Sequence, residues 1–306
     1  MNLSNYFVRR DVTFASVIVL ILVILLFSNF LFSVYQCPED RPIVVAAKHR
    51  RAIVSLLSLA SNDANHLSFN YTVSLCKLAV SFRARGGHSH DFIVLLVGNP
   101  IQISEFHMLR RAGWTVIPVD AIVSPLVYSF DHNKYTMARM YTKFQIWRLT
   151  SYEHVVYVDS DTIVLRDPMP ALERAYELVK GDPPGMVLDL GFCWSREYYN
   201  AGVMVVKPSV RVFRDLIFYR NWRLYNNFLA EQEFLNIFYN GRIVAIPREL
   251  NVPAYYHGNV SCALIDADTT VIAHYNGEEK PWLTNCTSHP ICRYWHSMPL
   301  YDNTSK

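Results

Sequence analysis

Several patterns are missing from this chain of 306 residues, and each absence argues against a class of protein. Lysine and arginine form no block and the formal net charge is only +3, so nucleic acid is a poor candidate partner. The six cysteines include no CxxC pair and no cysteine–histidine spacing of the zinc-binding kind. No repeat or low-complexity tract is present, and charged residues make up 18% against 51% hydrophobic residues. We therefore expect a folded chain with a large core and little general disorder.

Charge is also missing from the long apolar stretch of residues 12–36. As a helix, this stretch can span a bilayer core of about 30 Å. Arg9 and Arg10 precede it, and the positive-inside bias then places residues 1–11 in the cytosol and the following chain in the lumen. A cleaved signal peptide is the alternative, but the stretch is longer than a usual signal core and no small-x-small cleavage site follows. The pattern predicts one N-terminal transmembrane signal-anchor helix over residues 12–36.

The chain after residue 36 agrees with a lumenal address. We interpret residues 37–51 as a short stem and residues 52–306 as the lumenal domain. Four N-glycosylation sequons lie in this part, beginning at Asn70, Asn259, Asn285 and Asn303. A disulfide among three late cysteines would suit an oxidising lumen, and the sequence leaves the pair open: Cys262, Cys286 and Cys292.

From Ala52 onward, apolar runs typical of buried strands alternate with segments of helical periodicity. The expected strands are residues 52–59, 92–97, 115–119, 154–158 and 202–206. The expected helices are residues 71–83, 103–112, 141–149 and 228–239. This alternation predicts an α/β domain with a mostly parallel sheet. Ligands of such sheets bind outside the carboxyl ends of the strands, so these ends are where a site is expected.

One expected strand ends at two acidic residues, in the segment 155–161 (VVYVDSD). Asp159 and Asp161 can both lean toward one hard cation, because the small Ser160 leaves room between them. Oxygen ligands suit Mg²⁺ or Mn²⁺, and such a cation stabilises a diphosphate leaving group. The alternative is a solvated loop after a strand, because two acids at this spacing are common.

Four further segments give this pair of acids a context. They are residues 141–149 (YTKFQIWRL), 200–209 (NAGVMVVKPS), 231–236 (EQEFLN) and 274–282 (HYNGEEKPW). With the acids, they resemble in content and order the family-8 retaining glycosyltransferases, which include glycogenin, galactinol synthase and plant glucuronosyl- and xylosyltransferases. The resemblance covers roughly residues 52–283. It implies a single Rossmann-like, nucleotide-sugar-binding domain of the GT-A type, and hence a catalytic role for residues 52–306.

The resemblance also implies a ligand set and a diphosphate site. Asp159, Asp161 and His274 are expected to ligate Mn²⁺ (or Mg²⁺), and a neutral imidazole is a reasonable ligand beside carboxylates. Gly277 and Lys280 match the glycine and lysine that hold the diphosphate, since a backbone amide and an ammonium suit a pyrophosphate. For His274 considered alone, a structural histidine at a strand end is the alternative.

Further positions match residues that contact the donor in the family. Asn200 and Ala201 are expected to touch the donor sugar, and Ser160 is expected to contact the donor. Lys143 is expected to contact the donor or its nucleotide, with a solvated helix lysine as the alternative. Those expected near the nucleotide are Leu59, Ser61, Asn62, Tyr71 and Arg139. A second register places residues 56–58 in the first strand-loop, and Arg139 is the nearest candidate for a family arginine that is displaced in this chain.

Glu231 and Gln232 match a pair that lies beside the donor sugar in the family, and with Asp161 they are the expected catalytic residues. Retention of configuration can proceed through a covalent intermediate or by front-face attack with the leaving phosphate as base. The amide of Gln232 is a weak nucleophile, so Glu231 is the nearby carboxylate that could form an ester. We favour front-face attack, with both side chains orienting sugar hydroxyls.

The expected activity is therefore Mn²⁺-dependent transfer of a hexose or pentose from a UDP-sugar to a glycan or glycoprotein, in the Golgi or endoplasmic reticulum membrane. The alternatives are a catalytically silent lumenal glycan-binding module and a glycogenin-like self-glycosylating protein. The intact acids and histidine argue against the first, and the anchor and the lack of a matched acceptor tyrosine argue against the second. Donor, acceptor and oligomeric state are left open by the sequence.

Overall fold

The structure is a computed structural model that describes residues 17–23, 40–58, 66–98, 101–123, 139–189, 197–222, 229–254, 268–276, 280–283 and 290–301. The chain divides into two units, residues 1–39 and residues 40–306. In the first unit, residues 17–23 are helical and their apolar side chains are exposed. The other residues of the expected anchor, 12–16 and 24–36, lie outside the described residues. Within the ranges given above, no helix has both the length and the apolar character that a bilayer crossing requires.

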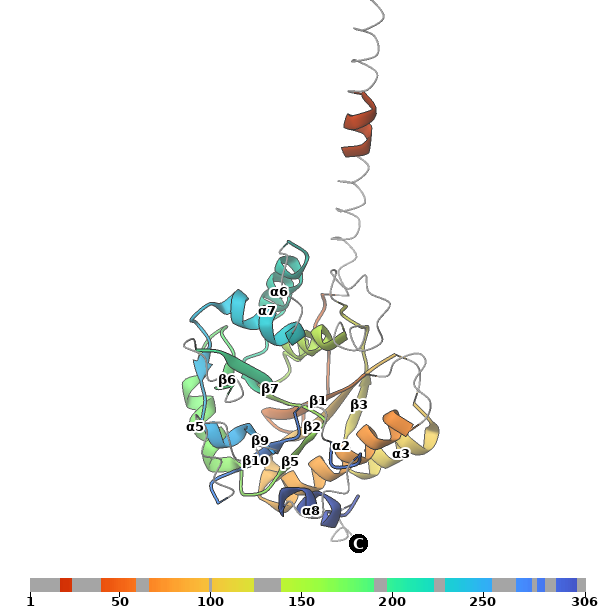
Figure 1. The fold of residues 1–306 in the computed structure, drawn as a ribbon, viewed down its shortest axis with the longest axis vertical. Coiled ribbons are helices and arrows are strands. Elements are labelled where there is room, and N and C mark those ends of the chain that lie inside the picture. Colours follow the sequence, from red (N-terminus) through yellow and green to blue (C-terminus); the bar gives the residue numbers. More distant parts are fainter. Residues whose placement is uncertain are drawn as a thin grey trace, which may run out of the picture. The chain divides into compact units, whose positions relative to one another are not determined.

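The second unit is built on a seven-stranded sheet in the order β3-β2-β1-β4-β7-β6-β8 (Figure 1). Its strands are β1 (Arg51–Ser58), β2 (Asp91–Val97), β3 (Thr115–Pro118), β4 (His154–Val158), β6 (Gly185–Leu188), β7 (Tyr199–Val206) and β8 (Val244–Ala245). Strands β3, β2, β1 and β4 are parallel, β7 runs antiparallel to β4 and β6, and β8 is parallel to β6. The mostly parallel α/β sheet is thus confirmed.

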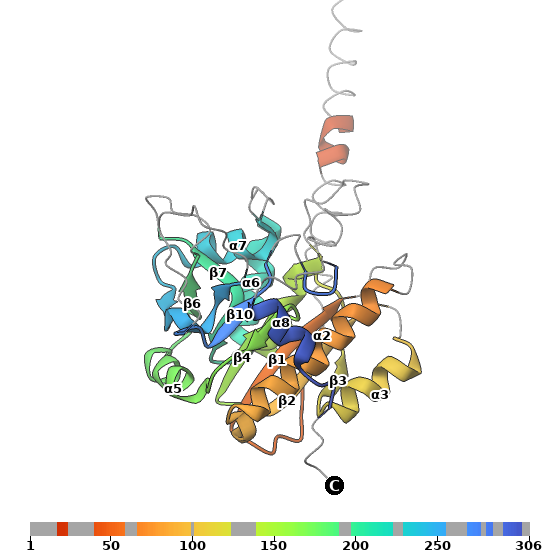
Figure 2. The ribbon, with the colours of Figure 1, turned by 60° about the horizontal axis from the view of Figure 1, so that its bottom comes forward.

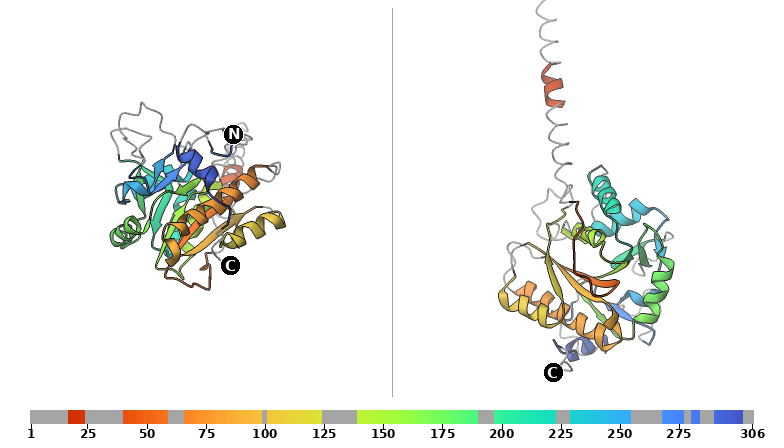
Figure 3. Two further views of the ribbon diagram at one scale, coloured as in Figure 1. Left: turned by 90° about the horizontal axis from the view of Figure 1, so that it is seen from below. Right: turned by 180° about the vertical axis from the view of Figure 1, so that it is seen from behind.

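Helices cover both faces of this sheet, as Figures 1 and 2 show. One face carries α2 (His66–Ala84), α3 (Ile103–Arg111) and α5 (Met169–Leu178). In Figure 3, α2 and α3 lie side by side in orange and yellow. The other face carries the 3₁₀ helix η2 (Met140–Arg148), α6 (Val210–Trp222) and α7 (Ala230–Tyr239). Two shorter 3₁₀ helices are η1 (Gly87–Ser89) and η4 (Arg248–Leu250).

The central strands are buried on both faces because their alternate side chains enter two different cores. In β1, Val54 belongs to the core that also contains residues of η2 and α6, while Ile53 belongs to the core that contains residues of α2. In β4, Val155 and Val156 divide in the same way. Continuous apolar runs are typical of such doubly covered strands. The carboxyl ends of β1 and β4 are therefore held firmly at one edge of the sheet.

A second sheet of three short strands, in the order β5-β10-β9, lies beyond the carboxyl end of β4. Its strands are β5 (Thr162–Val164), β9 (Val252–Pro253) and β10 (Ile272–His274). β10 pairs antiparallel with β5 and parallel with β9. The last helix, α8 (Pro290–Ser297), contributes Ile291 and Trp295 to a core shared with Ile163 and Ala273 of this sheet. This sheet joins the chain after β4 to segments near its C-terminal end.

The predicted helix at residues 141–149 is present, but it is a 3₁₀ helix. Three residues per turn align side chains at i and i+3, and this spacing stacks an aromatic row along the buried face. Ring centroids are 5.5 Å apart for Tyr141 and Phe144, and 6.1 Å apart for Phe144 and Trp147. Helical periodicity in the sequence did not distinguish this 3₁₀ helix from an α-helix.

The structure describes two of the six cysteines. Cys292 is disulfide-bonded, and Cys76 in α2 is a buried free thiol. The remaining four lie outside the described residues, Cys262 and Cys286 among them. The pairing among the three late cysteines thus stays a prediction.

Candidate active site

The two acids of the expected metal pair lie where β4 leaves the sheet. The amide of Asp159 donates to the carbonyl of Gly202 in β7 at 2.8 Å, which continues the strand pairing by one residue. The chain then turns, and the hydroxyl of Thr162 donates to the carbonyl of Asp159 at 2.7 Å. The carbonyl of Asp161 accepts from the amide of Tyr275 at 2.8 Å, next to β10. The backbone thus fixes both acids at the junction of the two sheets.

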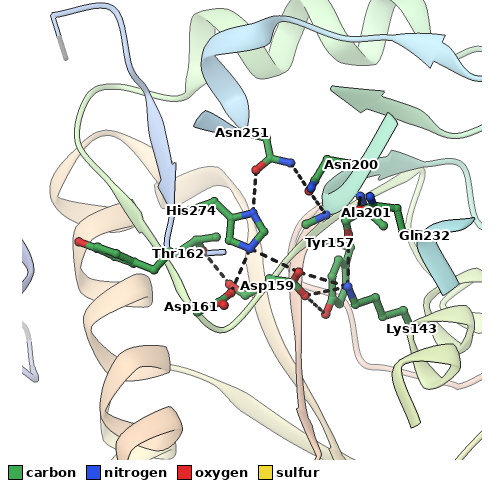
Figure 4. A network of polar contacts seen from close by, with 12 residues as sticks. Lys143, Tyr157, Asp159, Asp161, Thr162, Asn200, Ala201, Gln232, Asn251 and His274 are labelled. Atoms are coloured by element: carbon green, nitrogen blue, oxygen red, sulfur yellow. Dashed lines mark hydrogen bonds and ion pairs between the residues drawn. The ribbon is translucent and has the colours of Figure 1, made fainter. Parts of the chain in front are cut away.

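His274 ends β10 and faces both acids (Figure 4). Its Nε2 lies 3.2 Å from Oδ1 of Asp161 and 3.7 Å from Oδ2 of Asp159. One ligand atom from each of the three residues lies within 4.8 Å of the others. The sequence-based grouping of these residues is therefore reproduced in space, although they come from two sheets.

The donor set suits a hard divalent cation. Two carboxylates, the ligand type that Mn²⁺ and Mg²⁺ prefer, converge with one ring nitrogen. Burial raises the pKa of Asp161, but Lys280 and His274 lower it by more, so the pKa of this carboxyl is held well below its usual range. Asp161 is therefore ionised and able to act as a ligand, which is the protonation state that cation binding requires.

Lys143 forms a buried ionic cluster with two carboxylates on the other side of Asp159. Its Nζ lies 3.0 Å from Oδ1 of Asp159 and 2.6 Å from Oε1 of Glu231. Burial lowers the pKa of Lys143, but the two carboxylates raise it by more, so its pKa lies above the ordinary value. Burial raises the pKa of Glu231 against the opposing effect of Lys143. Lys143 is thus no solvated helix lysine, since its side chain is 4% exposed.

The amides of Asn200 and Gln232 converge on Asp189, at the end of β6. Nδ2 of Asn200 and Nε2 of Gln232 each donate to Oδ2 of Asp189 at 3.0 Å. The side chain of Gln232 also accepts from the amide of Ala201 at 3.0 Å. The predicted sugar-contacting residues Asn200 and Ala201 and the predicted catalytic Gln232 therefore form one group.

Lys280 reaches the metal side of the site. Its Nζ donates to Oδ2 of Asp161 at 2.5 Å and to the carbonyl of Tyr275 at 2.6 Å. The expected partner in diphosphate binding, Gly277, lies outside the described residues, so the complete clamp is not described. The ammonium of Lys280 is nonetheless next to the group that would hold the cation.

The residues expected near the nucleotide are less fully described. Leu59, Ser61 and Asn62 lie outside the described residues, and the choice between the two registers of this segment stays open. Tyr71 packs edge-to-face on Trp282, with ring centroids 5.0 Å apart, and so stands close to the Lys280 segment. Arg139 immediately precedes η2 and is half-buried. Ser160 is half-buried between the two acids.

Four residues of the site were not identified from the sequence. The hydroxyl of Tyr157 donates to Oδ1 of Asp159 at 2.7 Å, and Oδ1 of Asn251 lies 3.0 Å from Nδ1 of His274. Asp189 accepts hydrogen bonds from the side-chain amides of Asn200 and Gln232. Gly202 has no side chain where one would collide with the ring of His274. Tyr157 and Gly202 lay inside quoted motifs, whereas nothing local marks Asn251 or Asp189.

Comparison with known proteins agrees with the resemblance. Residues 192–286 match the family model described as Glycosyl transferase family 8. UDP-glucuronate:xylan alpha-glucuronosyltransferase 2 of Arabidopsis thaliana is 30% identical over 239 residues, which cover 75% of this chain and 36% of that protein. Glycogenin of Neurospora crassa is 25% identical over 240 residues, which cover 75% of this chain and 31% of that protein. These findings support a family-8 glycosyltransferase.

The fold comparison points the same way. The galactosyltransferase LgtC, solved with donor and acceptor sugar analogues, superimposes with a TM-score of 0.54 at 18% identity over 81% of this chain and 94% of that chain. This likeness supports a GT-A-like α/β fold. The chain spans about a third of the length of the curated relatives it matches. The segment matched to family 8 contains His274, Lys280 and the Glu231–Gln232 pair, and Asp159 and Asp161 precede it.

Proposed function

We propose that this chain is a retaining glycosyltransferase that moves a hexose or pentose from a UDP-sugar to a glycan or glycoprotein, with a divalent cation at Asp159, Asp161 and His274. The observation that carries the proposal is the convergence of these three ligands beside Lys280, at the sheet edge where nucleotide-sugar sites are expected. Mn²⁺ is the favoured cation, and Mg²⁺ is the alternative.

Several residues of the chain would have separate roles in this reaction. When bound, the cation would stabilise the negative charge on the diphosphate of UDP as UDP leaves. Lys280 adds a second positive charge on the same side, because its ammonium already lies against Asp161. Tyr157 and Lys143 hold the carboxylate of Asp159 in a fixed orientation. Preorganised charge of this kind costs no reorganisation when negative charge develops on the leaving group.

Front-face attack agrees with the contacts of Glu231 and Gln232. The side chain of Glu231 is 5% exposed, and its Oε1 lies 2.6 Å from the ammonium of Lys143, which reduces the strength of the carboxylate as a nucleophile. Gln232 is held by Ala201 and Asp189 at both ends of its amide. We therefore assign both residues to orienting the sugar, with the leaving phosphate as base for the acceptor hydroxyl.

The membrane arrangement is a further part of the proposal. Residues 12–36 would form a single signal anchor, with residues 1–11 cytosolic and residues 52–306 lumenal, in the Golgi or endoplasmic reticulum membrane. It rests on the uncharged apolar stretch, on Arg9 and Arg10 before it, and on the sequons after it.

The test is release of UDP by the full chain from a panel of UDP-sugars, with and without Mn²⁺. UDP-glucuronate is the first donor to try, because the Arabidopsis relative is named for it. At least one donor should be turned over, EDTA should abolish turnover, and Asp161→Asn should lower it by about 100-fold or more. Asp268→Asn is the matched control, because the side chain of Asp268 is 93% exposed and pairs with Arg166.

Two outcomes would overturn parts of the proposal. Full activity of the Asp161→Asn variant would remove the metal assignment. A folded chain that turns over no donor in the panel would favour the silent glycan-binding module. Mass spectrometry of the chain after incubation with each donor separates transfer to another molecule from self-glycosylation.

A further inference from the structure

A cavity of about 230 Å³ lies at the edge of the main sheet opposite to the candidate active site. Its walls come from the segment before β1, from the first residues of β2 and β3, and from Tyr152, which lies just before β4. Asp159 follows the other end of β4, so the length of this strand, about 16 Å, separates the two places. The cavity is therefore outside the proposed donor site, and its assignment does not depend on the proposed function.

The walls of this cavity are mostly basic. Of the described residues, five with basic side chains and one with an acidic side chain line it: Lys48, His49, Arg83, His88, His90 and Asp91. With the three imidazoles neutral, two positive charges against one negative charge leave a net charge of +1. A neutral imidazole still offers one N–H donor. A concave wall of one sign attracts ions of the opposite sign, so this wall favours an anion.

The acid, Asp91, is bound by donors that belong to the wall itself. Its Oδ2 accepts from the amide of Lys48 at 2.8 Å and from the hydroxyl of Tyr152 at 2.9 Å. The amide of His49 donates to the same oxygen at 3.4 Å. Burial and the hydrogen bond to Asp91 raise the pKa of Tyr152, so this hydroxyl stays a donor. Asp91 thus fixes the segment before β1 as a wall of the cavity.

Arg83, in the last turn of α2, is a cation held at a fixed place in the wall. Its Nη2 donates to the carbonyl of Ala112, and its guanidinium lies over the ring of Phe92, 5.1 Å from the centroid. It also packs against the bare backbone of Gly113, where a Cβ would collide with it. A guanidinium keeps its charge whatever it bonds. Because this side chain is already ordered, an anion that contacts it loses little affinity to side-chain entropy.

The other basic side chains differ in how they are held. His90 is buried, with Nε2 2.7 Å from the hydroxyl of Tyr176 and Nδ1 3.3 Å from Oγ of Ser89, so it closes the wall. Lys48 and His88 are exposed, and in the part of the chain that the structure describes neither side chain has a hydrogen bond or an ion pair. Both can therefore turn toward a bound ion.

We propose that this cavity binds a tetrahedral oxyanion, a phosphate or sulfate group, through Arg83, Lys48 and His88. These donors come from three segments, namely the end of α2, the stretch before β1 and the 3₁₀ helix η1. A tetrahedral group presents oxygens in several directions and so can meet donors from three segments, whereas a carboxylate presents two oxygens in one plane. The contacts are charge-assisted hydrogen bonds. A free ion and an ester of a larger molecule share this chemistry.

The test is calorimetric titration of the full chain with inorganic phosphate, exchanged for chloride at constant ionic strength so that screening stays the same. Divalent metal is left out, because the carboxylates of Asp159 and Asp161 then repel phosphate from the donor site. One saturable site with a dissociation constant of ~1 mM or tighter is expected from two or three charge-assisted contacts. The ring resonances of His88, identified by their absence in His88→Gln, should shift over the same concentrations.

Lys48→Met and Arg50→Met form a matched pair, because they remove the same charge from nearby positions. The side chain of Arg50 is 82% exposed, pairs with Glu153 and does not line the cavity. Lys48→Met should weaken phosphate binding by about tenfold, and Arg50→Met by less than about twofold. Since Lys48 is exposed, its loss should leave the fold intact.

Equal effects of the two substitutions would show a diffuse surface charge and overturn the proposal. Absence of saturable binding below about 10 mM phosphate would overturn it as well. Glucose 6-phosphate in the same titration separates the two sources of the group: tighter binding than inorganic phosphate assigns the site to an ester, and weaker binding assigns it to the free ion. Phosphate binding is measured without any UDP-sugar, so its outcome is independent of donor turnover.

Discussion

The substitution Gly202→Ala adds one methyl group between the two sides of the site. A Cβ at this position would lie 2.5 Å from Nδ1 of His274, closer still to Cε1 of the same ring, and 2.9 Å from Oδ1 of Asn200. Real Cβ atoms do not approach other atoms this closely. The ring must therefore move by about 1 Å or more to reach ordinary van der Waals contact.

The backbone of His274 cannot supply that movement. β10 pairs with β5 on one side and with β9 on the other, and the carbonyl of His274 accepts from the amide of Ala254 at 2.8 Å. The ring must instead rotate away, and it then loses the hydrogen bond to Asn251. We expect Mn²⁺ affinity to fall by at least 10- to 100-fold, or about 1.4–2.8 kcal/mol. Overpacking should cost about 1–3 kcal/mol of folding free energy.

Gly185→Ala is the matched control, because the same methyl group meets a different neighbourhood. Its Cβ would lie 2.5 Å from Ile246 and 2.6 Å from Val179, in the apolar core. Both variants should show lowered urea midpoints in EDTA, but only Gly202→Ala should lose Mn²⁺ binding by calorimetry. A folded Gly202→Ala variant that binds Mn²⁺ as tightly as wild type would refute the role given to this glycine.

Two further predictions concern buried charge. Lys143→Met should lower the free energy of unfolding without metal by about 3–5 kcal/mol, because it leaves the carboxylates of Asp159 and Glu231 without the ammonium that pairs with them. Urea denaturation should show that the double variant Lys143→Met/Glu231→Gln recovers part of this loss. No recovery would contradict the ionic cluster. Burial and the nearby Arg51 lower the pKa of His90 from 6.5 to about 4, so its contribution is full above pH 6.5 and is lost as the pH falls toward 4. The free energy of unfolding should fall by about 3 kcal/mol over this range. Urea denaturation at each pH measures it in wild type and in His90→Gln. An equal fall in both proteins would refute the role given to His90.

The sequence predicted the parts of this site that depend on local pattern. The end of β4 at Val158 follows from an apolar run that stops at an acid, and the sheet type follows from alternating strands and helices. The place of His274 beside Asp159 and Asp161 came from the resemblance, because nothing within residues 270–280 alone identifies a ligand. These expectations succeeded where the information lies within one element or one motif.

The contacts of Asn251 and Asp189 could not be predicted in the same way. Asn251 reaches Asn200 and His274 only because β9 pairs with β10 and because β7 continues past the end of β4. Asp189 accepts hydrogen bonds from two side-chain amides because β6 and β7 change register between Met186 and Val187. Cross-strand register and sheet-to-sheet placement are properties of the whole fold, and single-sequence periodicity does not contain them.

The junction of the two sheets also has a consequence for how this chain matures. Lys280 and Asp161 are 119 residues apart in sequence, and closing so long a loop costs entropy that local contacts do not repay. During synthesis the nucleus of parallel strands can form before His274 and Lys280 have emerged, but the group that they form with Asp159 and Asp161 cannot. Cation binding by the nascent or refolding chain should therefore be among the last native properties to appear, and it offers a direct reporter of completed folding.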